Sequence, residues 1–305
     1  MDPDINILPI TDDRITDLQK LFFLVFGKKH TVSYLQSKYD TSYLGVNHVA
    51  HLAYDGSNPV AFVGAIPMPF LLNGKKLTGV QYCDYMTLPQ YRRKGIHTLL
   101  LEKNRELATK QGADFIFAMH TTNSANGDLR FAWNFQEPLN AYVIPLVTPA
   151  ILQLVNRIQQ FLSRNSSNST KFHQQQIKWP QYAVADVVHV DYSEPFFRYK
   201  AFAGARIIEL NKVFFWIKSG VVMEVGNIAG ADNGNLKKSF EDLLPMASKM
   251  GCSRLIVQPR KNTPIDKFLK TQYTPVSGYC PAFQVLKPDL EIANLQLNYC
   301  DFDTF

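Results

Sequence analysis

Residues 80–110 constrain what this chain can fold into more than any other stretch, because a strand, a short basic turn and a helix follow one another there. Val80–Leu88 mixes β-branched with aromatic residues, which indicates a strand, and Pro89 ends it. Basic residues and a glycine make up Arg92–Gly95. Ile96–Lys110 then has apolar residues at helical spacing. The sequence therefore predicts a strand, turn and helix unit whose turn is positively charged.

This turn has the features of an anion-binding site. The first N–H groups of a helix have no intrahelical acceptor, and the helix dipole adds positive potential at the same end. Gly95 has no Cβ, so the backbone there can come close to a ligand. A phosphate or pyrophosphate suits such a site. The alternative is a basic turn that connects the strand to the helix and binds nothing.

The segment Tyr91–Ile96, read YRRKGI, and the leucines that follow it resemble the acyl-CoA-binding loop of the GNAT N-acyltransferases, whose pattern is Arg/Gln-x-x-Gly-x-Gly/Ala. Arg92 stands at the first position of this pattern and Gly95 at its first glycine. His97 stands where the second Gly or Ala is expected, so the chain departs from the pattern there. The place of the motif between a strand and a leucine-rich helix strengthens the resemblance. It implies that acetyl-CoA or another acyl-CoA is a co-substrate.

The order of the predicted elements is also similar to that of the GNAT fold. A strand at Asn6–Ile10 is followed by helices near Arg14–Phe26 and Val32–Tyr39, and then by a three-stranded meander that ends at the basic turn. The helix after the turn leads to a buried strand at Phe115–Met119. The resemblance thus extends over about residues 6–138 and implies an α/β fold with a mixed sheet.

An asparagine after the buried strand is a further point of resemblance. GNAT proteins have an Asn there, which Asn123 matches, and a turn or cap role is the alternative for this residue. Many members have a Tyr in the next helix that protonates the leaving thiolate. Arg130 stands at that position, so another group must serve or the thiolate leaves unassisted. By this resemblance, the residues that contact the acyl-CoA are Met86, Thr87, Leu88, Arg92, Arg93, Lys94, Gly95, Ile96, His97 and Asn123.

The chain is long enough for two domains. A helix that begins near Thr148 leads into Ser163–Gln176, a polar stretch of low complexity that reads as an exposed linker. We therefore expect an acyl-CoA-binding GNAT domain at residues 1–145, a helix and linker at 146–178, and a second domain at 179–305.

The second half repeats the order of a meander, a helix and a strand, which is again the GNAT order. Where the basic turn would lie, Asn227–Gly234 has no basic residue, and Asp232 would repel a pyrophosphate. The second domain is therefore predicted to be a degenerate GNAT-like domain without an acyl-CoA site of its own.

Acyl transfer to an amine requires a base that removes a proton from the incoming ammonium and an N–H group that polarises the thioester carbonyl. By the same resemblance, the backbone of Met86–Leu88 would supply the N–H group. Asp84 is a candidate base because its aromatic and sulfur-containing neighbours predict partial burial. A structural carboxylate that accepts backbone N–H bonds is the alternative. His120, at the end of the next strand, is a second candidate, with a structural histidine as its alternative.

The C-terminus offers a further candidate base. Asn298–Phe305 mixes carboxylates with aromatic residues and does not read as a disordered tail. Some double-GNAT aminoglycoside acetyltransferases use the carboxylate at the chain end as base. By this resemblance, the terminal carboxylate of Phe305 or the side chain of Asp303 would enter the cleft of the first domain. A tail that only packs between the domains is the alternative.

Composition narrows the classes of partner. The net charge of +6 is spread over 305 residues without a dense Lys/Arg run, which argues against a nucleic-acid partner. No metal site is expected, because the four cysteines are far apart and lack a Cys-x-x-Cys pair. The N-terminus does not read as a signal peptide. The most apolar segment, Ala141–Val155, contains two prolines and is too short to span a membrane. We expect a cytoplasmic protein.

These features favour an N-acyltransferase that moves an acetyl or other acyl group from acyl-CoA to an amine of a small molecule, for example an amino sugar. Direct attack in a ternary complex is favoured, because Cys83 has no neighbouring His in the sequence. The alternative is a catalytically silent acyl-CoA-binding or scaffold protein, which the departures at His97 and Arg130 favour. Asp84 and the Arg92–Gly95 turn favour the enzyme. A homodimer is left open.

Overall fold

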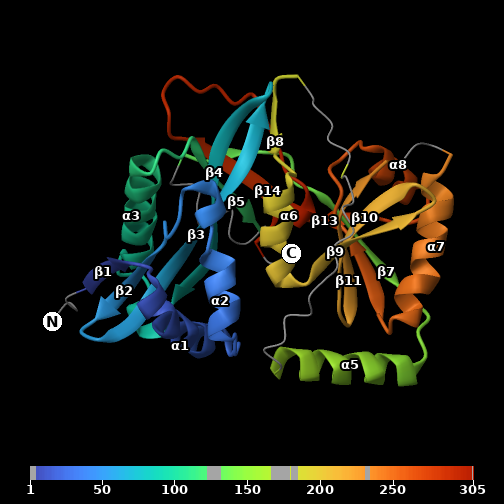
Figure 1. Ribbon diagram of the computed structural model, residues 1–305, viewed down its shortest axis with the longest axis horizontal. Helices are drawn as coiled ribbons and strands as arrows, with labels where there is room; N and C mark the ends of the chain where they lie inside the picture. Colours follow the sequence, from blue (N-terminus) through green and yellow to red (C-terminus); the bar gives the residue numbers. More distant parts are fainter. Residues whose placement is uncertain (1–4, 122–131, 166–178, 180–184, 231–233, 304) are drawn as a thin grey trace.

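A computed structural model describes residues 5–121, 132–165, 179, 185–230, 234–303 and 305 of the chain. Figure 1 shows two lobes side by side, each built from a sheet with helices packed against it. The C-terminus lies between the lobes, far from the N-terminus. The architecture is therefore mixed α/β, as the sequence predicts.

Nine strands form the first sheet. Their bounds are β1 Ile5–Pro9, β2 His51–Asp55, β3 Asn58–Leu72, β4 Lys75–Thr87, β5 Phe115–His120, β6 Asn134–Phe135, β8 Val187–Val190, β14 Cys280–Val285 and β15 Asn294–Gln296. The main path runs β1-β2-β3-β4-β5-β14-β6, while β8 pairs with β3 and β15 pairs with β8. Strands β4 and β5 are parallel, and the other pairs on the main path are antiparallel.

In the part of the chain that the structure describes, three α-helices accompany this sheet: α1 Ile15–Phe26, α2 Val32–Tyr39 and α3 Ile96–Lys110. The buried residues of α1 recur every three or four positions, at Ile15, Leu18, Leu21 and Phe22, as expected for one face of an amphipathic helix. Gly27, at a φ of 67°, ends α1 in the left-handed conformation, and its N–H bonds to the carbonyl of Phe23. The helices predicted near Arg14–Phe26 and Val32–Tyr39 are confirmed.

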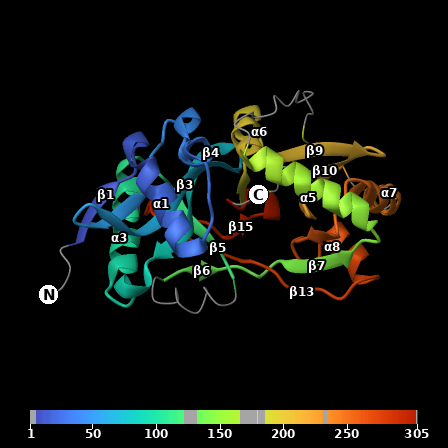
Figure 2. The same cartoon turned by 90° about the horizontal axis from the view of Figure 1, so that it is seen from below.

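Six strands form the second sheet, in the order β13-β7-β12-β11-β10-β9. Their bounds are β7 Asn140–Pro145, β9 Ala205–Leu210, β10 Val213–Ser219, β11 Val222–Ala229, β12 Arg254–Val257 and β13 Val276–Ser277. The helices of this half are α5 Ala150–Asn165, α6 Glu194–Lys200, α7 Leu236–Lys249 and α8 Pro264–Lys270. Figure 2 shows the molecule from below, with α5 lying across the near side of the second lobe.

Both sheets follow the same plan. In the first, the meander β2-β3-β4 is followed by α3 and by β5, which is parallel to β4. In the second, the meander β9-β10-β11 is followed by α7 and by β12, which is parallel to β11. The second half is therefore a GNAT-like unit, as its order of elements predicts.

The two halves exchange strands. β14, from the C-terminal part of the chain, pairs with β5 in the first sheet, and β7, which precedes α5, pairs with β12 in the second. Strand pairing thus crosses the domain boundaries expected from the sequence (1–145, 146–178 and 179–305) in both directions. The boundaries remain a prediction, and they describe only the order of the units along the chain. The exchange makes each sheet depend on the other half for its completion.

Candidate active site

The candidate site lies near the end of β4, where its register with β3 shifts and its pairing with β5 ends. The register of β3 and β4 shifts between Phe62 and Gly64, which places Asp84 in a β-bulge with a φ of 47°. Asp tolerates this left-handed conformation better than most residues. The pairing of β4 with β5 ends at Tyr82 and Ala118, although both strands continue. A gap between the two parallel strands therefore opens just beyond the bulge.

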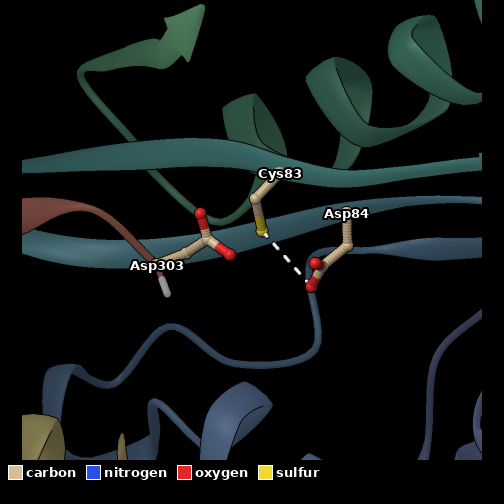
Figure 3. Close-up of side chains that lie close together, drawn as sticks. All are labelled: Cys83, Asp84 and Asp303. Carbon is tan, nitrogen blue, oxygen red and sulfur yellow. Dashed lines mark hydrogen bonds between the residues drawn. The ribbon is translucent and has the colours of Figure 1, made fainter. Parts of the chain in front are cut away.

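A buried ion pair joins this bulge to α2 and to the C-terminus. The ammonium of Lys38 lies 2.5 Å from the Oδ2 atom of Asp84 and 2.7 Å from the Oδ2 atom of Asp303. The hydroxyl of Tyr39 donates to the same oxygen of Asp84 at 2.6 Å. Figure 3 shows the two carboxylates side by side, Asp84 from β4 and Asp303 from the last residues of the chain. We call Lys38, Tyr39, Asp84 and Asp303 the Lys38 cluster.

Burial and charge act on Lys38 in opposite directions. Its side chain is only 3% exposed, and burial by itself lowers the pKa of an ammonium. The carboxylates of Asp303 and Asp84 outweigh this effect and hold the pKa of Lys38 well above its usual value. Burial and the nearby Asp84 carboxylate raise the pKa of Tyr39 well above its usual value as well. Lys38 is therefore charged and Tyr39 neutral at physiological pH.

Cys83, Asp84 and Asp303 lie close enough together to share a metal ion (Figure 3). Two observations favour a different role. Burial and the two carboxylates raise the pKa of the Cys83 thiol well above its usual value, and a protonated thiol is a poor ligand. The ammonium of Lys38 already contacts both carboxylates. The positive charge that two adjacent carboxylates require thus comes from the chain itself.

Two side chains of α6, in the second half, donate hydrogen bonds to the backbone of the segments that carry the Lys38 cluster. The hydroxyl of Tyr199 in α6 donates to the backbone carbonyl of Lys38 at 2.7 Å. The ammonium of Lys200 donates to the carbonyl of Phe302 at 2.6 Å, one residue before Asp303. Helix α6 therefore fixes both α2 and the C-terminal segment.

The basic turn lies directly after β4. A single turn of 3₁₀ helix spans Pro89–Tyr91, and the side chain of Arg92 donates back to the carbonyl of Thr87 at 3.1 Å. Arg93 and Gly95 have positive φ values of 63° and 75°, a left-handed conformation that glycine adopts with less strain than other residues. The first bond of α3 runs from Leu99 N–H to the Gly95 carbonyl. The strand, turn and helix unit predicted from the sequence is confirmed.

The side chains of the turn divide into two groups. Arg92, Arg93 and Lys94 are exposed, and the Lys94 ammonium lies 5.4 Å from the centre of the Tyr91 ring. Ile96 is buried in the core and anchors the start of α3. His97 is half-buried, and its ring meets that of Tyr85 edge-on at 5.2 Å between centroids. The basic residues thus face solvent, while Ile96 and His97 face the protein.

Some backbone N–H groups at the end of β4 donate hydrogen bonds within the sheet, and others do not point toward β3. The N–H of Leu88 donates to the carbonyl of Val60 at 2.9 Å, so it points toward β3. Because successive N–H groups of a strand point to opposite edges, that of Thr87 points toward the gap beside β5 and that of Met86 toward β3. Of the three backbone groups singled out in the sequence, Thr87 is the one directed at the gap.

His120 lies two residues beyond Ala118, where the pairing of β5 with β4 ends. It ends β5, is buried, and has its ring beside those of Trp133 and Phe135, each at 5.4 Å between centroids. Burial lowers its pKa to about 4, so the imidazole is neutral at pH 7 and a weak proton acceptor. Its proposed role as a base stays a prediction.

The C-terminal segment enters the region between the halves. The ring of Phe305 is 1% exposed and packs against those of Trp216 and Tyr299. A Cβ on Gly226 would lie 2.5 Å from this ring, so the glycine makes room for it. The ring anchors the chain end, which carries the Asp303 carboxylate to Lys38. The role of the terminal carboxylate of Phe305 stays a prediction.

Some expectations fall on residues that the structure does not describe. Asn123 and Arg130 lie outside the described residues, as does Asp232 in the second half. Sequence reasoning also missed two members of the cluster, Lys38 and Tyr39. Lys38 lies three residues after the buried Leu35 on α2, and a lysine on an apolar helix face is a signal that a partner carboxylate is near.

The comparisons with known proteins agree with this geometry. Residues 6–123 match the family described as acetyltransferase (GNAT) domain. The match identifies residues 6–123 as a GNAT domain. The match covers the basic turn, Asp84 and β5, and proteins of this family generally use acyl-CoA. No curated protein matches the sequence.

Solved structures extend the likeness over the whole chain. A GCN5-related N-acetyltransferase from Kribbella flavida has a TM-score of 0.58 at 10% identity, covering 93% of this chain and 71% of that one. Saccharomyces cerevisiae N-myristoyltransferase with bound myristoyl-CoA has a TM-score of 0.56 at 12% identity, covering 96% and 83%. A GCN5-related N-acetyltransferase from Anabaena variabilis has a TM-score of 0.56 at 9% identity, covering 93% and 73%. At these identities the likeness shows the GNAT fold alone.

Proposed function

We propose that this protein transfers an acetyl or other acyl group from acyl-CoA to an amine of a small molecule, by direct attack within a ternary complex. One observation carries the proposal. The strand that holds Asp84 in the buried Lys38 cluster ends at Thr87, and only a single turn of 3₁₀ helix separates it from the Arg92–Gly95 turn at the start of α3. A cofactor held at that turn would lie alongside Asp84.

In this proposal the pyrophosphate of the cofactor binds at the basic turn. Arg92, Arg93 and Lys94 are exposed there, and the start of α3 adds N–H donors and a favourable dipole. The pantetheine arm then follows the gap between β4 and β5. The N–H of Thr87, which is directed at that gap, would donate to the thioester carbonyl oxygen and stabilise the negative charge that develops on it.

The charge of the Lys38 cluster favours a cationic acceptor. One ammonium faces two carboxylates, so with both carboxylates ionised one negative charge is in excess. An amine substrate enters as an ammonium ion, and a buried excess of negative charge attracts it. An amino sugar fits this requirement, as do other small primary amines.

The proposed reaction consists of removal of a proton from the ammonium, attack on the thioester and release of CoA. The ammonium loses a proton to a carboxylate oxygen of Asp84, and the resulting amine nitrogen attacks the thioester carbonyl carbon. The carbon–sulfur bond breaks, and its electron pair stays on sulfur as the CoA thiolate. The proton that remains in excess on the new amide nitrogen is lost to solvent. His120 and the terminal carboxylate of Phe305 are the alternative bases.

A catalytically silent acyl-CoA-binding protein is the second candidate function. The observation that favours it is the saturation of one Asp84 oxygen, which accepts from both Lys38 and Tyr39. A carboxylate engaged in this way can be purely structural. Binding of acyl-CoA without turnover would then be the whole activity.

Two measurements test the proposal together. Calorimetric titration with acetyl-CoA and with CoA measures cofactor binding, and release of CoA thiol in the presence of a panel of primary amines measures turnover. Arg92→Glu combined with Lys94→Glu should weaken cofactor binding by at least about tenfold. The matched control is Lys75→Glu with Lys76→Glu, an exposed pair on β4 far along the strand from the turn.

Asp84→Asn separates the two candidate functions. The enzyme should lose at least about a hundredfold in turnover while its affinity for CoA is retained. Unchanged turnover in Asp84→Asn would remove Asp84 as the base and leave His120 or the terminal carboxylate. Cofactor binding with no turnover on any amine would favour the silent protein. Absence of binding to acetyl-CoA and to longer acyl-CoAs would overturn the whole proposal.

A further inference from the structure

Helix α5 presents an apolar stripe to solvent. The stripe consists of Ile151, Leu154, Val155 and Ile158, which recur at helical spacing and are between 42% and 65% exposed. The helix touches the body of the protein along a different line. The side chain of Asn156 donates to the carbonyl of Gly220 at 2.9 Å, and the backbone of Leu152 comes up against Gly251. The apolar stripe therefore points away from the second sheet.

The end of α1 carries a second apolar group on the same side of the molecule. Phe23, Leu24 and Phe26 are 46% to 50% exposed. Figure 1 places α1 and α5 along the bottom of the two lobes, and Figure 2, seen from below, shows both helices on the near side. The two helices thus lie on one side of the molecule, and each has large apolar side chains exposed to solvent. We call this face, made by α1 and α5, the lower face.

Exposed basic residues accompany both helices. They are Lys20, Lys28 and Lys29 at α1 and Arg157 on α5. The one acidic residue within α1, Asp17, accepts a hydrogen bond from the hydroxyl of Tyr54. The ammonium of Lys28 lies 5.7 Å from the centre of the Phe26 ring, and that of Lys29 lies 5.5 Å from the Phe23 ring. Cations and aromatic rings are thus interleaved at the end of α1.

A small hollow lies beside these rings. It has a volume of about 330 Å³ and is lined by Thr16, Gln19, Lys20, Phe23, Lys29 and His30. Two ammonium groups and an aromatic ring at its wall suit a negatively charged head group with an attached apolar chain.

From these observations we infer that the lower face docks on an anionic lipid bilayer, with the apolar side chains of α1 and α5 in the interface and the basic residues at the head groups. A basic amphipathic helix of modest overall hydrophobicity is the element that lies in a bilayer surface without crossing it. Among the described residues, no helix is long and apolar enough to cross a membrane. The bilayer contact is therefore peripheral.

Charge argues against a second copy of the chain as the occupant. A symmetric dimer through this face would bring α5 against α5, and so Arg157 near its equivalent, with no carboxylate on the helix to compensate. The head groups of an anionic lipid bilayer would provide the negative charge that Arg157 lacks in such a dimer. Each basic residue at an anionic surface strengthens binding by about fivefold, and this gain falls as salt screens it.

Sedimentation with lipid vesicles tests this inference on the full chain. Vesicles of phosphatidylcholine alone are compared with vesicles of phosphatidylcholine and phosphatidylserine at about 2:1. We expect binding to the anionic vesicles, weaker binding to the neutral ones, and a clear loss of binding when the salt concentration is raised. None of these readouts requires acyl-CoA, so their outcome does not depend on the proposed enzymatic activity.

Matched variants locate the contact. Ile151→Asp should weaken binding to the anionic vesicles by at least about tenfold, because it removes an inserted side chain and adds a negative charge. Val276→Asp makes a comparable change at an exposed valine on β13, 58% exposed against 65% for Ile151, and should leave binding unchanged. Lys28→Glu with Lys29→Glu should lose at least about tenfold, and Lys75→Glu with Lys76→Glu should not.

Three outcomes would overturn the inference. The first is absence of binding to the anionic vesicles. The second is binding that the control variants weaken as much as the variants on the lower face do, which would mean a non-specific effect of net charge. The third is a concentration-dependent dimer, measured by light scattering, that Ile151→Asp dissociates, which would assign the lower face to a second copy of the chain.

Discussion

Replacing Lys38 tests the role of the buried cluster most directly. In Lys38→Met the apolar part of the side chain is kept, but the ammonium that contacts Asp84 at 2.5 Å and Asp303 at 2.7 Å is lost. Two carboxylates then face each other in a site where the side chain of Lys38 is 3% and that of Asp303 also 3% exposed. Removing one partner of a buried ion pair costs about 3–5 kcal/mol, because the remaining charge is left uncompensated. We expect a loss of this size in the free energy of unfolding at pH 7.

A matched substitution gives the comparison. Lys103 lies 2.7 Å from Glu106, the same separation as between Lys38 and Asp303, but these side chains are 43% and 64% exposed. Lys103→Met should therefore cost no more than about 0.5 kcal/mol. Both variants remove one ammonium, so their difference reports the combined effect of burial and of the second carboxylate beside Lys38. Urea unfolding followed by fluorescence and circular dichroism measures both.

The sign of the pH dependence follows from the pKa of Lys38. Its folded-state pKa is raised above the unfolded value of 10.5, so its contribution to stability is fully present below that value and is lost only as pH rises through the folded pKa. Adding Asp303→Asn to Lys38→Met should recover part of the loss at pH 7. A cost for Lys38→Met no larger than that for Lys103→Met would refute the reasoning.

Three further substitutions probe the surroundings. Gly64→Ala places a Cβ 2.7 Å from the hydroxyl of Tyr39, and we expect a loss of about 1–3 kcal/mol in urea unfolding together with reduced turnover. Gly226→Ala places a Cβ 2.5 Å from the ring of Phe305, and its cost should be similar if that ring anchors the chain end, which limited digestion by carboxypeptidase would detect as faster release of the last residues. His120 has a pKa of about 4 when folded and 6.5 when unfolded, so the wild type should lose stability as pH falls through this window. His120→Asn should abolish that loss, which unfolding at pH 7 and pH 4.5 compares.

The local unit around the basic turn could be predicted from the sequence because its signals are short-range. Pro89, the glycine at position 95 and the helical spacing of the leucines lie within a few residues of one another, and each acts on the backbone next to it. Gly95 has the positive φ that its place before α3 requires. The partial burial expected for Asp84 is also observed, since its side chain is 11% exposed.

The partners of Asp84 could not be predicted in the same way. Lys38 lies 46 residues before it along the chain, and the paired residues Lys38 and Asp303 are 265 residues apart. No local pattern encodes a contact over such separations, and the bulge that turns Asp84 toward Lys38 depends on the register between β3 and β4. The exchange of β7 and β14 escaped prediction for a similar reason, because a strand's own residues indicate that it pairs but not with which sheet.

The contacts that the second half makes with the Lys38 cluster give it a structural role at the candidate site. Its segment Asn227–Gly234 has no basic residue, so it lacks the charge that we propose binds a pyrophosphate at the corresponding turn of the first half. It nevertheless supplies the Asp303 carboxylate, and through α6 it holds the backbone of Lys38 and of Phe302. Without Asp303 the ammonium of Lys38 would face a single carboxylate, and the excess negative charge that favours a cationic acceptor would disappear. The second half can therefore lack a cofactor site and still be needed, because the charge of the Lys38 cluster in the first half depends on the Asp303 carboxylate.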